Sequence, residues 1–472
     1  MDRNWFDDAR LGMFIHWDHA SQRGWEVSWP LVGGVFSLPY CQKVGVDEYH
    51  ALAGSFDPQA WDPTALARRA VEAGMRYVVV TTRHHSGFSM FATSYSPYGV
   101  MNTPCGRDLV RETVDAFRAA GLRIGLYYSL SDWHHPDYPA FREEFKPYVL
   151  GQSPPLPSEE QATRFRAYLM GQLDELMTGY GRIEVMWFDG QWERPAQWWH
   201  PEEIEALLRA RQPGILINNR LPGRGDFDTP EQFIPATPPT GRWESCLTMN
   251  ESWGWNPDDN HYKSPRAIVH ALCETAGRGG NLLLNVSPRG DGSLPPEQLE
   301  RLDSLGSWLA ANGEAIYGTS AGLEPWQFNG PSTRRGDRVF VFLLMRPYET
   351  VTVRGLPVRR VTRATMLGSG AELTFSIRTG VMAQLERDPE GEIIINGPEH
   401  LLDGLASVIA LDLDGPRAVP GSCASLWSVD RCTTTFTHCS TPNKWRFFST
   451  RITPPSTGAW PKCWPPASGS TS

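Results

Sequence analysis

Residues 76–85, RYVVVTTRHH, contain the strongest strand signal in the chain. The run 77–82 is uncharged and rich in β-branched residues, and it ends before Arg83, His84 and His85. Uninterrupted apolar runs of this length are typical of strands that are covered on both faces, as in parallel sheets. The stretch therefore predicts a buried strand with polar side chains at its carboxyl end.

Seven further segments carry the same signal, and helical segments separate several of them. The other predicted strands are 12–17, 124–129, 184–189, 215–219, 226–233, 243–249 and 281–286, and apolar spacing predicts helices at 64–75, 108–120, 166–178 and 265–276. Strands that alternate with helices in this way predict an α/β fold, a (β/α)8-like TIM barrel. A doubly wound open sheet is the alternative, and the lack of a GxGxxG fingerprint after the first strand weighs against it.

The pattern changes after residue 319. Short alternating strands are predicted at 338–344, 350–353, 392–395 and 406–411, with Gly, Pro and Asp between them, which indicates a C-terminal β-sandwich. We therefore expect a barrel over 1–320 and a sandwich over 321–415. Residues 416–472 hold six basic residues and one acid and are rich in Ser, Thr and Pro, so we expect a disordered extension or a sequence translated out of its natural frame.

The charge balance and the apolar pattern limit the classes of partner. Lys and Arg number 44 against 53 Asp and Glu, which argues against a nucleic-acid binder, because such proteins neutralise phosphates. No run of about eighteen apolar residues predicts a membrane-spanning helix. No basic start followed by an apolar run marks a secretory signal. We expect a cytoplasmic protein that binds neither nucleic acid nor membrane, and we leave a homo-oligomer open.

Polar side chains recur where the predicted strands end. In a (β/α)8 barrel the active site lies at the carboxyl ends of the strands, so these side chains are expected to meet. They are His16, His84, His85, Tyr127, Tyr128, Asp189, Asn219, Arg220 and Glu231, and Trp243 and Glu244 begin the seventh strand. Each one has a structural alternative as a packing or capping residue, but their recurrence at strand ends indicates a functional site.

Two carboxylates are the strongest candidates for chemistry. Asp189 follows two aromatic residues, where an ionised group is costly to bury without a partner or a chemical role; its structural alternative is the N-cap of a following helix. Glu231 lies in a Thr-Pro-Glu loop, and its alternative is an exposed loop acid. A pair of carboxylates at a pocket is the equipment of glycoside hydrolysis: one attacks or stabilises, and the other protonates the leaving oxygen.

The histidines raise the alternative of a metal-dependent barrel hydrolase, since histidine is the commonest metal ligand. Such sites usually place two ligands at i and i+2 on one face of a strand, whereas His16 is followed by Trp17 and Asp18. His84 and His85 are adjacent and are expected to face opposite ways. We therefore favour neutral imidazoles that bind sugar hydroxyls, with no metal.

Ten ordered motifs resemble the α-L-fucosidase family, glycoside hydrolase family 29. They are MFIHW (13–17), RYVVVTTRHHSGFSMF (76–91), GLRIGLYYSLSDW (121–133), VMWFDG (185–190), INNR (217–220), TPE (229–231), RWESC (242–246), SWGWN (252–256), GGNLLLNVSPRGDG (279–292) and GEAIYGTS (313–320). The resemblance implies a (β/α)8-like barrel followed by a β-sandwich. It also implies hydrolysis of α-L-fucosides with retention through a covalent fucosyl-enzyme, without a metal or other cofactor.

The resemblance assigns roles by matching motif positions. Asp189 matches the nucleophile, and the residues that match fucose-binding positions are His16, His84, His85, Tyr127 and Arg220. Trp187 and Trp253 match aromatics at the apolar edge of the sugar, and Trp29 matches more loosely.

The general acid/base varies in position within the family. Glu231 matches the acid of some members and is our choice, Glu244 matches the place used by others, and Glu26 ranks third. The resemblance also favours α-1,3/1,4-fucosyl linkages in a fucosylated glycan. A non-catalytic fucose-binding protein is the alternative from another class.

Overall fold

The computed structural model describes residues 4–32, 44–139, 156–397 and 399–415, so the expectation for the tail after residue 415 lies outside the described residues. Eight strands form a sheet in the order β5-β4-β3-β2-β1-β8-β7-β6, and every pairing within it is parallel. The strands are β1 (Leu11–Ile15), β2 (Tyr77–Arg83), β3 (Arg123–Ser129), β4 (Val185–Asp189), β5 (Leu216–Ile217), β6 (Phe227–Asp228), β7 (Arg242–Leu247) and β8 (Asn281–Val286). All eight overlap the predicted strands.

The two ends of this sheet meet at β5 and β6. A parallel bridge joins Asn218 to Phe227, the N–H of Asn219 donates to the carbonyl of Phe227 at 2.9 Å, and the N–H of Asp226 donates to Ile217 at 2.6 Å. These bonds close the strands into a ring, as a barrel requires. The barrel prediction is confirmed, and the open doubly wound sheet is wrong.

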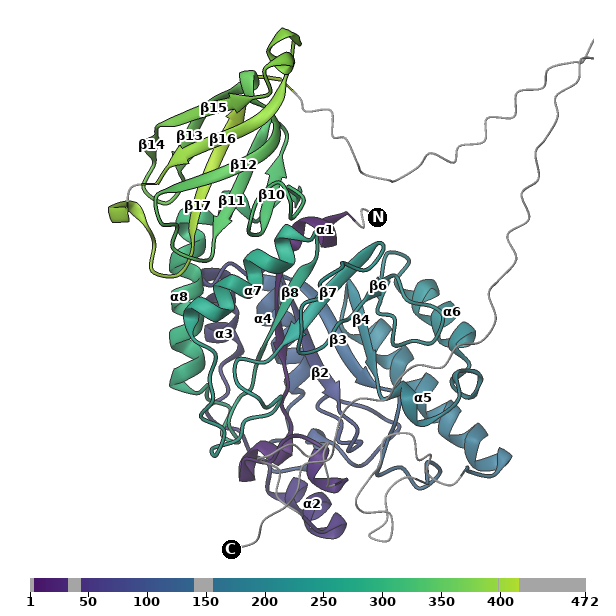
Figure 1. Cartoon of the computed structure of the whole chain (residues 1–472). Coiled ribbons are helices and arrows are strands. Elements are labelled where there is room, and N and C mark those ends of the chain that lie inside the picture. The colour runs from purple at the N-terminus through teal and green to yellow at the C-terminus, as the bar shows by residue number, and fades with distance from the viewer. Residues whose placement is uncertain (1–3, 33–43, 140–155, 398, 416–472) are drawn as a thin grey trace, which may run out of the picture. The chain divides into compact units, whose positions relative to one another are not determined.

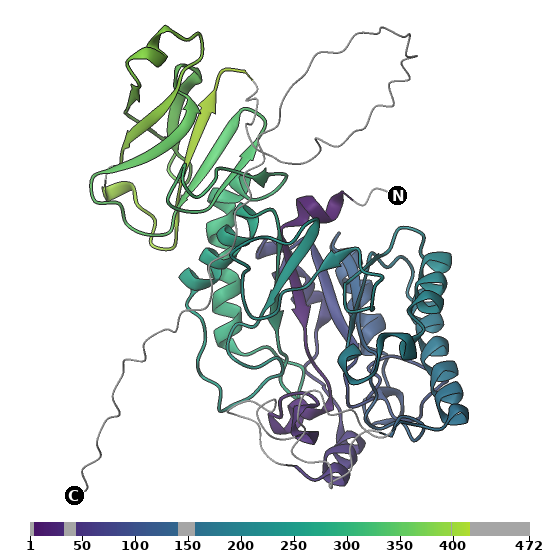
Figure 2. The same ribbon diagram turned by 45° about the vertical axis from the view of Figure 1, so that its right-hand side comes forward.

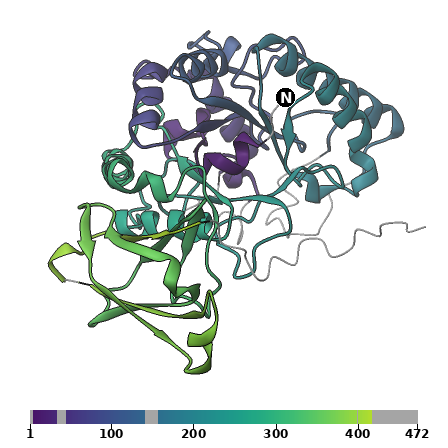
Figure 3. The same cartoon turned by 90° about the horizontal axis from the view of Figure 1, so that it is seen from above.

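Among the residues that the structure describes, six helices flank the strands (Figures 1 and 3): α3 (Pro63–Glu72), α4 (Leu109–Ala119), α5 (Glu159–Gly179), α6 (Pro201–Arg211), α7 (Pro265–Gly277) and α8 (Pro296–Asn312). The short helices α1 (Trp5–Ala9) and α2 (Val46–Ala51) lie beyond the ends of the strands. The described connections after β5 and β6 contain no α-helix, so the strand–helix repeat is incomplete there. The first connection is short, and the second carries four prolines, which disfavour helix interiors.

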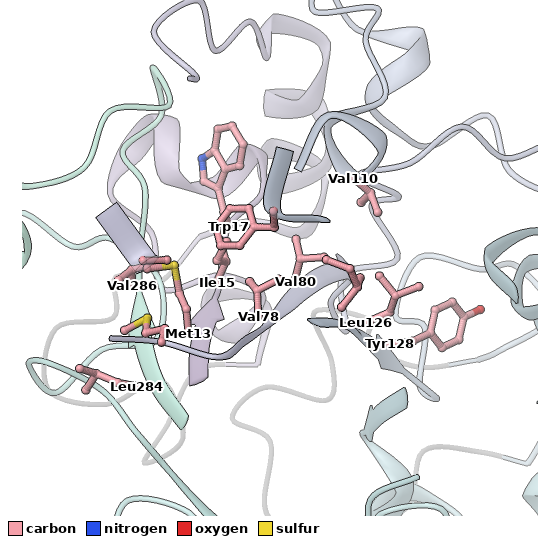
Figure 4. Packing of buried hydrophobic residues seen from close by; sticks show 14 of the residues in the cluster. Met13, Ile15, Trp17, Val78, Val80, Val110, Leu126, Tyr128, Leu284 and Val286 are labelled. Carbon is pink, nitrogen blue, oxygen red and sulfur yellow. The ribbon is translucent and has the colours of Figure 1, made fainter. Parts of the chain in front are cut away.

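The period-two alternation of the strands divides their side chains between two cores. Met13 and Ile15 of β1 and Val78 and Val80 of β2 point outward and pack in one cluster with helix residues such as Val110 of α4 (Figure 4). The intervening residues, such as Phe14, Val79, Tyr127, Trp187 and Leu283, point into the barrel and form a second cluster, which Trp253 of the connection after β7 joins. Because Trp187 points inward, Asp189, two residues later, points inward as well.

The C-terminal part contains two antiparallel sheets (Figure 2), which confirms the predicted β-sandwich. Their orders are β14-β13-β17-β11-β10-β9 and β12-β16-β15. The strands are β9 (Ser320–Ala321), β10 (Ser332–Arg335), β11 (Arg338–Leu343), β12 (Thr350–Pro357), β13 (Val361–Met366), β14 (Ala371–Leu373), β15 (Phe375–Thr379), β16 (Glu390–Asn396) and β17 (Ser407–Leu413). A separate apolar cluster, which includes Val353, Ile393 and Leu411, lies between the sheets.

Contacts group Met1–Ala418 into one compact unit, so the domain limits at residues 320 and 415 stay predictions. None of the helices in the described part of the chain has the length and apolar content needed to cross a membrane. The cytoplasmic localisation stays a prediction.

Candidate active site

A cavity of about 480 Å³ contains the carboxyl ends of several barrel strands in its lining. Its walls combine two carboxylates and one guanidinium with histidine and aromatic rings, which is the mixture expected of a sugar site. The lining residues are Phe14, His16, Trp29, His84, Tyr127, Trp187, Asp189, Gln191, Trp192, Asn219, Arg220, Thr229, Glu231 and Trp253.

Asp189 ends β4 and is 8% exposed. Its Oδ1 accepts a hydrogen bond of 2.6 Å from Nη1 of Arg220, and its Oδ2 accepts one of 2.9 Å from the Tyr127 hydroxyl. Burial raises the pKa of Asp189, but the charge of Arg220, the nearby His85 ring and these hydrogen bonds outweigh it and hold the pKa below its ordinary value. The carboxylate is therefore ionised at neutral pH. The N-cap alternative is wrong, because the short helix that follows has no side-chain cap.

Arg220 joins the two acids of the cavity. While Nη1 donates to Asp189, Nη2 donates to Oε2 of Glu231 at 2.5 Å. The guanidinium also lies over the Trp187 ring, 4.5 Å from its centroid, and Nε donates to the Thr229 hydroxyl at 3.2 Å. These four contacts fix the orientation of Arg220, so the two carboxylates are neighbours across one guanidinium group.

Glu231 is positioned by a backbone pairing with the end of β7. It forms a parallel bridge with Cys246, the N–H of Cys246 donates to Pro230 at 3.1 Å, and the N–H of Gln232 donates to Cys246 at 3.0 Å. The side chain of Glu231 is 38% exposed and faces the cavity. Glu231 is therefore an exposed loop acid, as the structural alternative predicted, but the backbone pairing fixes it beside Asp189.

Glu244 and Glu26 are buried and do not line the cavity. Glu244 lies inside the barrel, where it accepts hydrogen bonds from the Tyr77 hydroxyl at 2.5 Å and from the Trp187 indole at 2.8 Å. Burial raises its pKa to about 7. Glu26 accepts the backbone N–H groups of Trp253 and Gly254, and burial raises its pKa to about 8. Both acids hold tryptophans of the cavity wall in place.

The three predicted histidines lie together. Nδ1 of His16 is 2.7 Å from Oδ1 of Asn285, Nδ1 of His84 is 2.7 Å from the Ser28 hydroxyl, and Nδ1 of His85 is 2.6 Å from the Ser129 hydroxyl. Burial lowers the pKa of His16 and of His85 to about 4, so both rings are neutral at pH 7.

The expectation that His84 and His85 face opposite ways is wrong. Each offers a nitrogen that lies, together with a carboxylate oxygen of Asp189, within a group whose atoms are all within 4.8 Å of one another. The reason is that β2 ends at Arg83, so both residues lie in the following turn, where strand alternation no longer applies.

His84, His85 and Asp189 are the one group of metal-ligand type found among the described residues. Arg220 already neutralises Asp189 at 2.6 Å, and a guanidinium at that distance opposes the approach of a divalent cation. The donor set therefore fits a metal poorly.

Comparison with known proteins agrees with this geometry. Residues 2–314 match the protein-family model described as alpha-L-fucosidase. The chain belongs to this family. Tissue alpha-L-fucosidase of Homo sapiens is 30% identical over 425 residues, which cover 84% of this chain and 85% of the human protein. The chain is therefore a glycoside hydrolase of the fucose-releasing class, with a fucosylated glycan as its substrate.

Solved structures of fucosidases share the fold. Alpha-L-fucosidase isoenzyme 1 from Paenibacillus thiaminolyticus is 36% identical with a TM-score of 0.75, and the match covers 87% of this chain and 98% of that one. An alpha-L-fucosidase from Bacteroides thetaiotaomicron, described as a trapped covalent intermediate with 2-fluoro-fucosyl fluoride, is 29% identical with a TM-score of 0.73. That match covers 87% of this chain and 95% of the other.

The cavity of this fucosidase brings together most of the sequence-predicted site residues. His85 is fully buried behind the wall and reaches the site through Asp189, 3.6 Å from its Nε2. The sequence reasoning did not select Phe14, Gln191, Trp192 or Thr229 as site residues. Phe14 lies two residues before His16 on one strand face, so alternation could have found it, whereas no local signal marks Gln191 or Trp192.

Proposed function

We propose that the chain is a retaining, exo-acting α-L-fucosidase in which Asp189 is the nucleophile and Glu231 is the general acid/base. The observation that carries this proposal is the guanidinium of Arg220, which bonds to both carboxylates at 2.6 and 2.5 Å. Retaining glycosidases place their two carboxylates about 5 Å apart, and inverting enzymes leave room for a water between them. Two acids bridged by one guanidinium favour the closer arrangement.

In the first half of the proposed reaction, Asp189 attacks the anomeric carbon of the fucosyl residue. The bond to the leaving oxygen breaks, and Glu231 gives that oxygen its proton. In the second half, Glu231 takes a proton from water, which attacks the anomeric carbon and releases Asp189 and fucose. Two inversions at one carbon give net retention.

Asp189 suits the role of nucleophile because its pKa is held below the ordinary value and it is ionised before substrate binds. Tyr127 and Arg220 fix its two oxygens. Positioned donors of this kind stabilise the negative charge that returns to the carboxylate when the covalent intermediate breaks down.

Glu231 suits the role of acid/base better than Glu244 or Glu26. It lines the cavity and is accessible to the solvent water that the second step consumes. Glu244 and Glu26 are at most 1% exposed, and both oxygens of each accept hydrogen bonds from protein groups that hold the site together. A proton on either would have no short path to a leaving oxygen in the cavity.

The lining suits one terminal 6-deoxy sugar. Neutral His16 and His84 offer hydrogen-bonding nitrogens for hydroxyl groups, and Arg220 offers donors. Phe14, Trp187 and Trp253 give apolar faces for the methyl group, with Phe14 and Trp187 ring centroids 5.1 Å apart. Because Phe14 and Trp187 are buried in the barrel, a glycan enters end-on, which supports exo-action. Trp29, half-buried and 5.5 Å from the His85 ring, completes the rim.

Replacement of Asp189 by Ala tests the proposal. We expect turnover of an aryl α-L-fucoside to fall by about 10⁴-fold or more, azide to restore part of it as a fucosyl azide, and wild-type enzyme to release α-fucose first in NMR spectra. Asp174→Ala, on the exposed face of α5, is the matched control. A mild rate loss in Asp189→Ala, or β-fucose as the first product, would contradict the proposal.

The preference for α-1,3/1,4 linkages is also proposed here, on the resemblance of the sequence motifs. A panel of fucosylated oligosaccharides of defined linkage tests it. Higher kcat/KM on α-1,3/1,4-linked substrates than on α-1,2- or α-1,6-linked ones is expected, and the reverse order refutes the preference without touching the two carboxylate roles.

A further inference from the structure

Asn285, in the middle of the LLLNVSP run, connects two residues of the cavity wall without lining the cavity. It points inward from β8 and is 1% exposed. Its Nδ2 donates to the carbonyl of Trp253 at 2.7 Å, and its Oδ1 is 2.7 Å from Nδ1 of His16. One amide side chain therefore bonds to a histidine on one side and to a backbone carbonyl on the other.

The peptide between Trp253 and Gly254 determines how that amide is oriented. The N–H of Gly254 donates to Oε2 of Glu26 at 2.7 Å, and an N–H group can only donate. The carbonyl of the same trans peptide points the opposite way, towards Asn285. This holds whether Glu26 is ionised or protonated, because the N–H group needs an acceptor in both cases.

The Trp253 carbonyl then determines the orientation of the Asn285 amide, and the amide determines the tautomer of His16. A carbonyl oxygen accepts only, so the nitrogen of the Asn285 amide faces Trp253 and its oxygen faces His16. An amide oxygen also accepts only, so the hydrogen between it and His16 is carried by Nδ1. In a neutral imidazole the other nitrogen is then unprotonated.

We propose that Asn285 is a positioning residue that locks His16 in the Nδ1-protonated tautomer, so that its Nε2 meets the substrate as a hydrogen-bond acceptor. His16 lines the cavity, and Nε2 has no hydrogen-bond partner among the residues that the structure describes. The inference rests on the proposed function for its ligand: a fucosyl hydroxyl donates to Nε2. Because the tautomer is already set in the free enzyme, no binding free energy is lost in selecting it when the substrate binds.

The tautomer can be read directly in the free enzyme. Protein labelled with ¹⁵N in its histidine rings is recorded in a long-range ¹H–¹⁵N correlation spectrum at pH 7, and the His16 signals are assigned by their loss in His16→Gln. The expected result is a protonated Nδ1 and an unprotonated Nε2. A protonated Nε2, or a mixture of both tautomers, would overturn the proposal.

Asn285→Asp gives a functional test with a pH readout. The new carboxylate still accepts from Nδ1 but adds a negative charge, which favours the imidazolium form of His16 and raises its pKa by roughly 1–3 units. Since the imidazolium has no acceptor nitrogen, the acidic limb of kcat/KM moves to higher pH. The other titratable or charged groups around His16 are unchanged in the variant: Asp189, Arg220, His84, His85 and Tyr127.

Asn312→Asp is the matched control, because Asn312 is also buried and its Nδ2 also donates to a backbone carbonyl, but on α8. A residue with only a structural role would lose stability without moving the acidic limb. An unshifted limb together with a protonated Nε2 of His16 in a folded Asn285→Asp enzyme refutes the proposal. If that variant does not fold, the tautomer in the unmodified enzyme decides.

The proposed tautomer of His16 and the proposed function can be refuted independently of each other. The spectrum of the free enzyme needs no turnover, so a wrong tautomer in an active retaining fucosidase removes only the role of Asn285. An enzyme with the expected tautomer that releases no α-fucose removes the proposed function and leaves the positioning of His16 intact.

Discussion

Nη1 of Arg220 lies 2.6 Å from Oδ1 of Asp189, and both side chains are close to nine-tenths buried. Burial raises the pKa of this carboxyl, and the guanidinium lowers it by more. The charge of Arg220 thus decides that Asp189 is ionised in the free enzyme.

Replacing Arg220 by Gln removes that charge and leaves the burial in place. We expect the pKa of Asp189 to rise, so the acidic limb of the kcat/KM profile moves to higher pH, and we expect kcat/KM at its optimum to fall by about 10²–10³-fold. The measurement is a pH–rate profile on an aryl fucoside. Arg224→Gln is the control, because Arg224 pairs with Glu202 on the surface. An unchanged acidic limb in Arg220→Gln would show that another group keeps Asp189 ionised.

Substrates with good and poor leaving groups distinguish the role of Glu231 from that of Glu244. In Glu231→Ala, a good leaving group needs no proton in the first half-reaction, so an activated aryl fucoside keeps most of its kcat/KM, whereas kcat/KM on a natural oligosaccharide falls by about 10²–10⁴-fold. In Glu244→Ala, the Trp187 indole and the Tyr77 hydroxyl lose their acceptor, so both substrates are affected alike and the enzyme is less stable. A leaving-group effect in Glu244→Ala alone would exchange the two roles.

Glu244 also predicts a dependence of stability on pH. Burial raises its pKa from 4.5 to about 7, so the folded protein keeps a proton that the unfolded chain releases. This contribution is complete below about pH 4.5 and is lost as the pH rises through 7, a change of about 3 kcal/mol. The amide of Glu244→Gln does not titrate, so the variant does not show this loss of stability. Relative to wild type, the variant's free energy of unfolding is therefore expected to increase between pH 4.5 and 7, as denaturant titrations at several pH values can show.

Glu300→Gln, on the exposed face of α8, is the control for that series. Its free energy of unfolding is expected to follow the wild-type curve. Parallel curves for Glu244→Gln and wild type would mean that Glu244 is ionised in the folded barrel at neutral pH.

Removal of metal ions is expected to leave kcat/KM unchanged. Arg220 supplies the positive charge beside Asp189 that a cation would otherwise supply, and it occupies one of the carboxylate oxygens. The measurement is an assay after exhaustive dialysis against a chelator. Loss of activity that added Zn²⁺ or Mg²⁺ restores would instead place a metal at His84, His85 and Asp189.

The position of Asp189 could be predicted from sequence because two rules combine there. Alternation puts it on the face of Trp187, and the end of the apolar run puts it at the carboxyl edge of the barrel. His16 and Tyr127 follow from the same two rules. Arg220 and Glu231 could also be named from the sequence, but their closeness depends on the closure between β5 and β6, and the backbone pairings that make this closure cannot be read from the sequence of such short strands.

The place of Glu244 could not be predicted from alternation alone. It is the third residue of β7, so it faces inward but lies far from the carboxyl edge, beneath Trp187. Alternation gives the face of a strand and not the depth in the barrel. Likewise, the turn after Arg83 brings His84 and His85 to one side, which no strand rule describes.

The attachment of the sugar to Asp189 is the central claim, and a mechanism-based label tests it most directly. Enzyme treated with 2-fluoro-fucosyl fluoride, digested and sequenced by tandem mass spectrometry, is predicted to carry one fluorofucosyl group on the Asp189 carboxylate, and Asp189→Asn is predicted to stay unlabelled. A label on another residue, or inactivation of the wild type without any covalent label, would contradict the account.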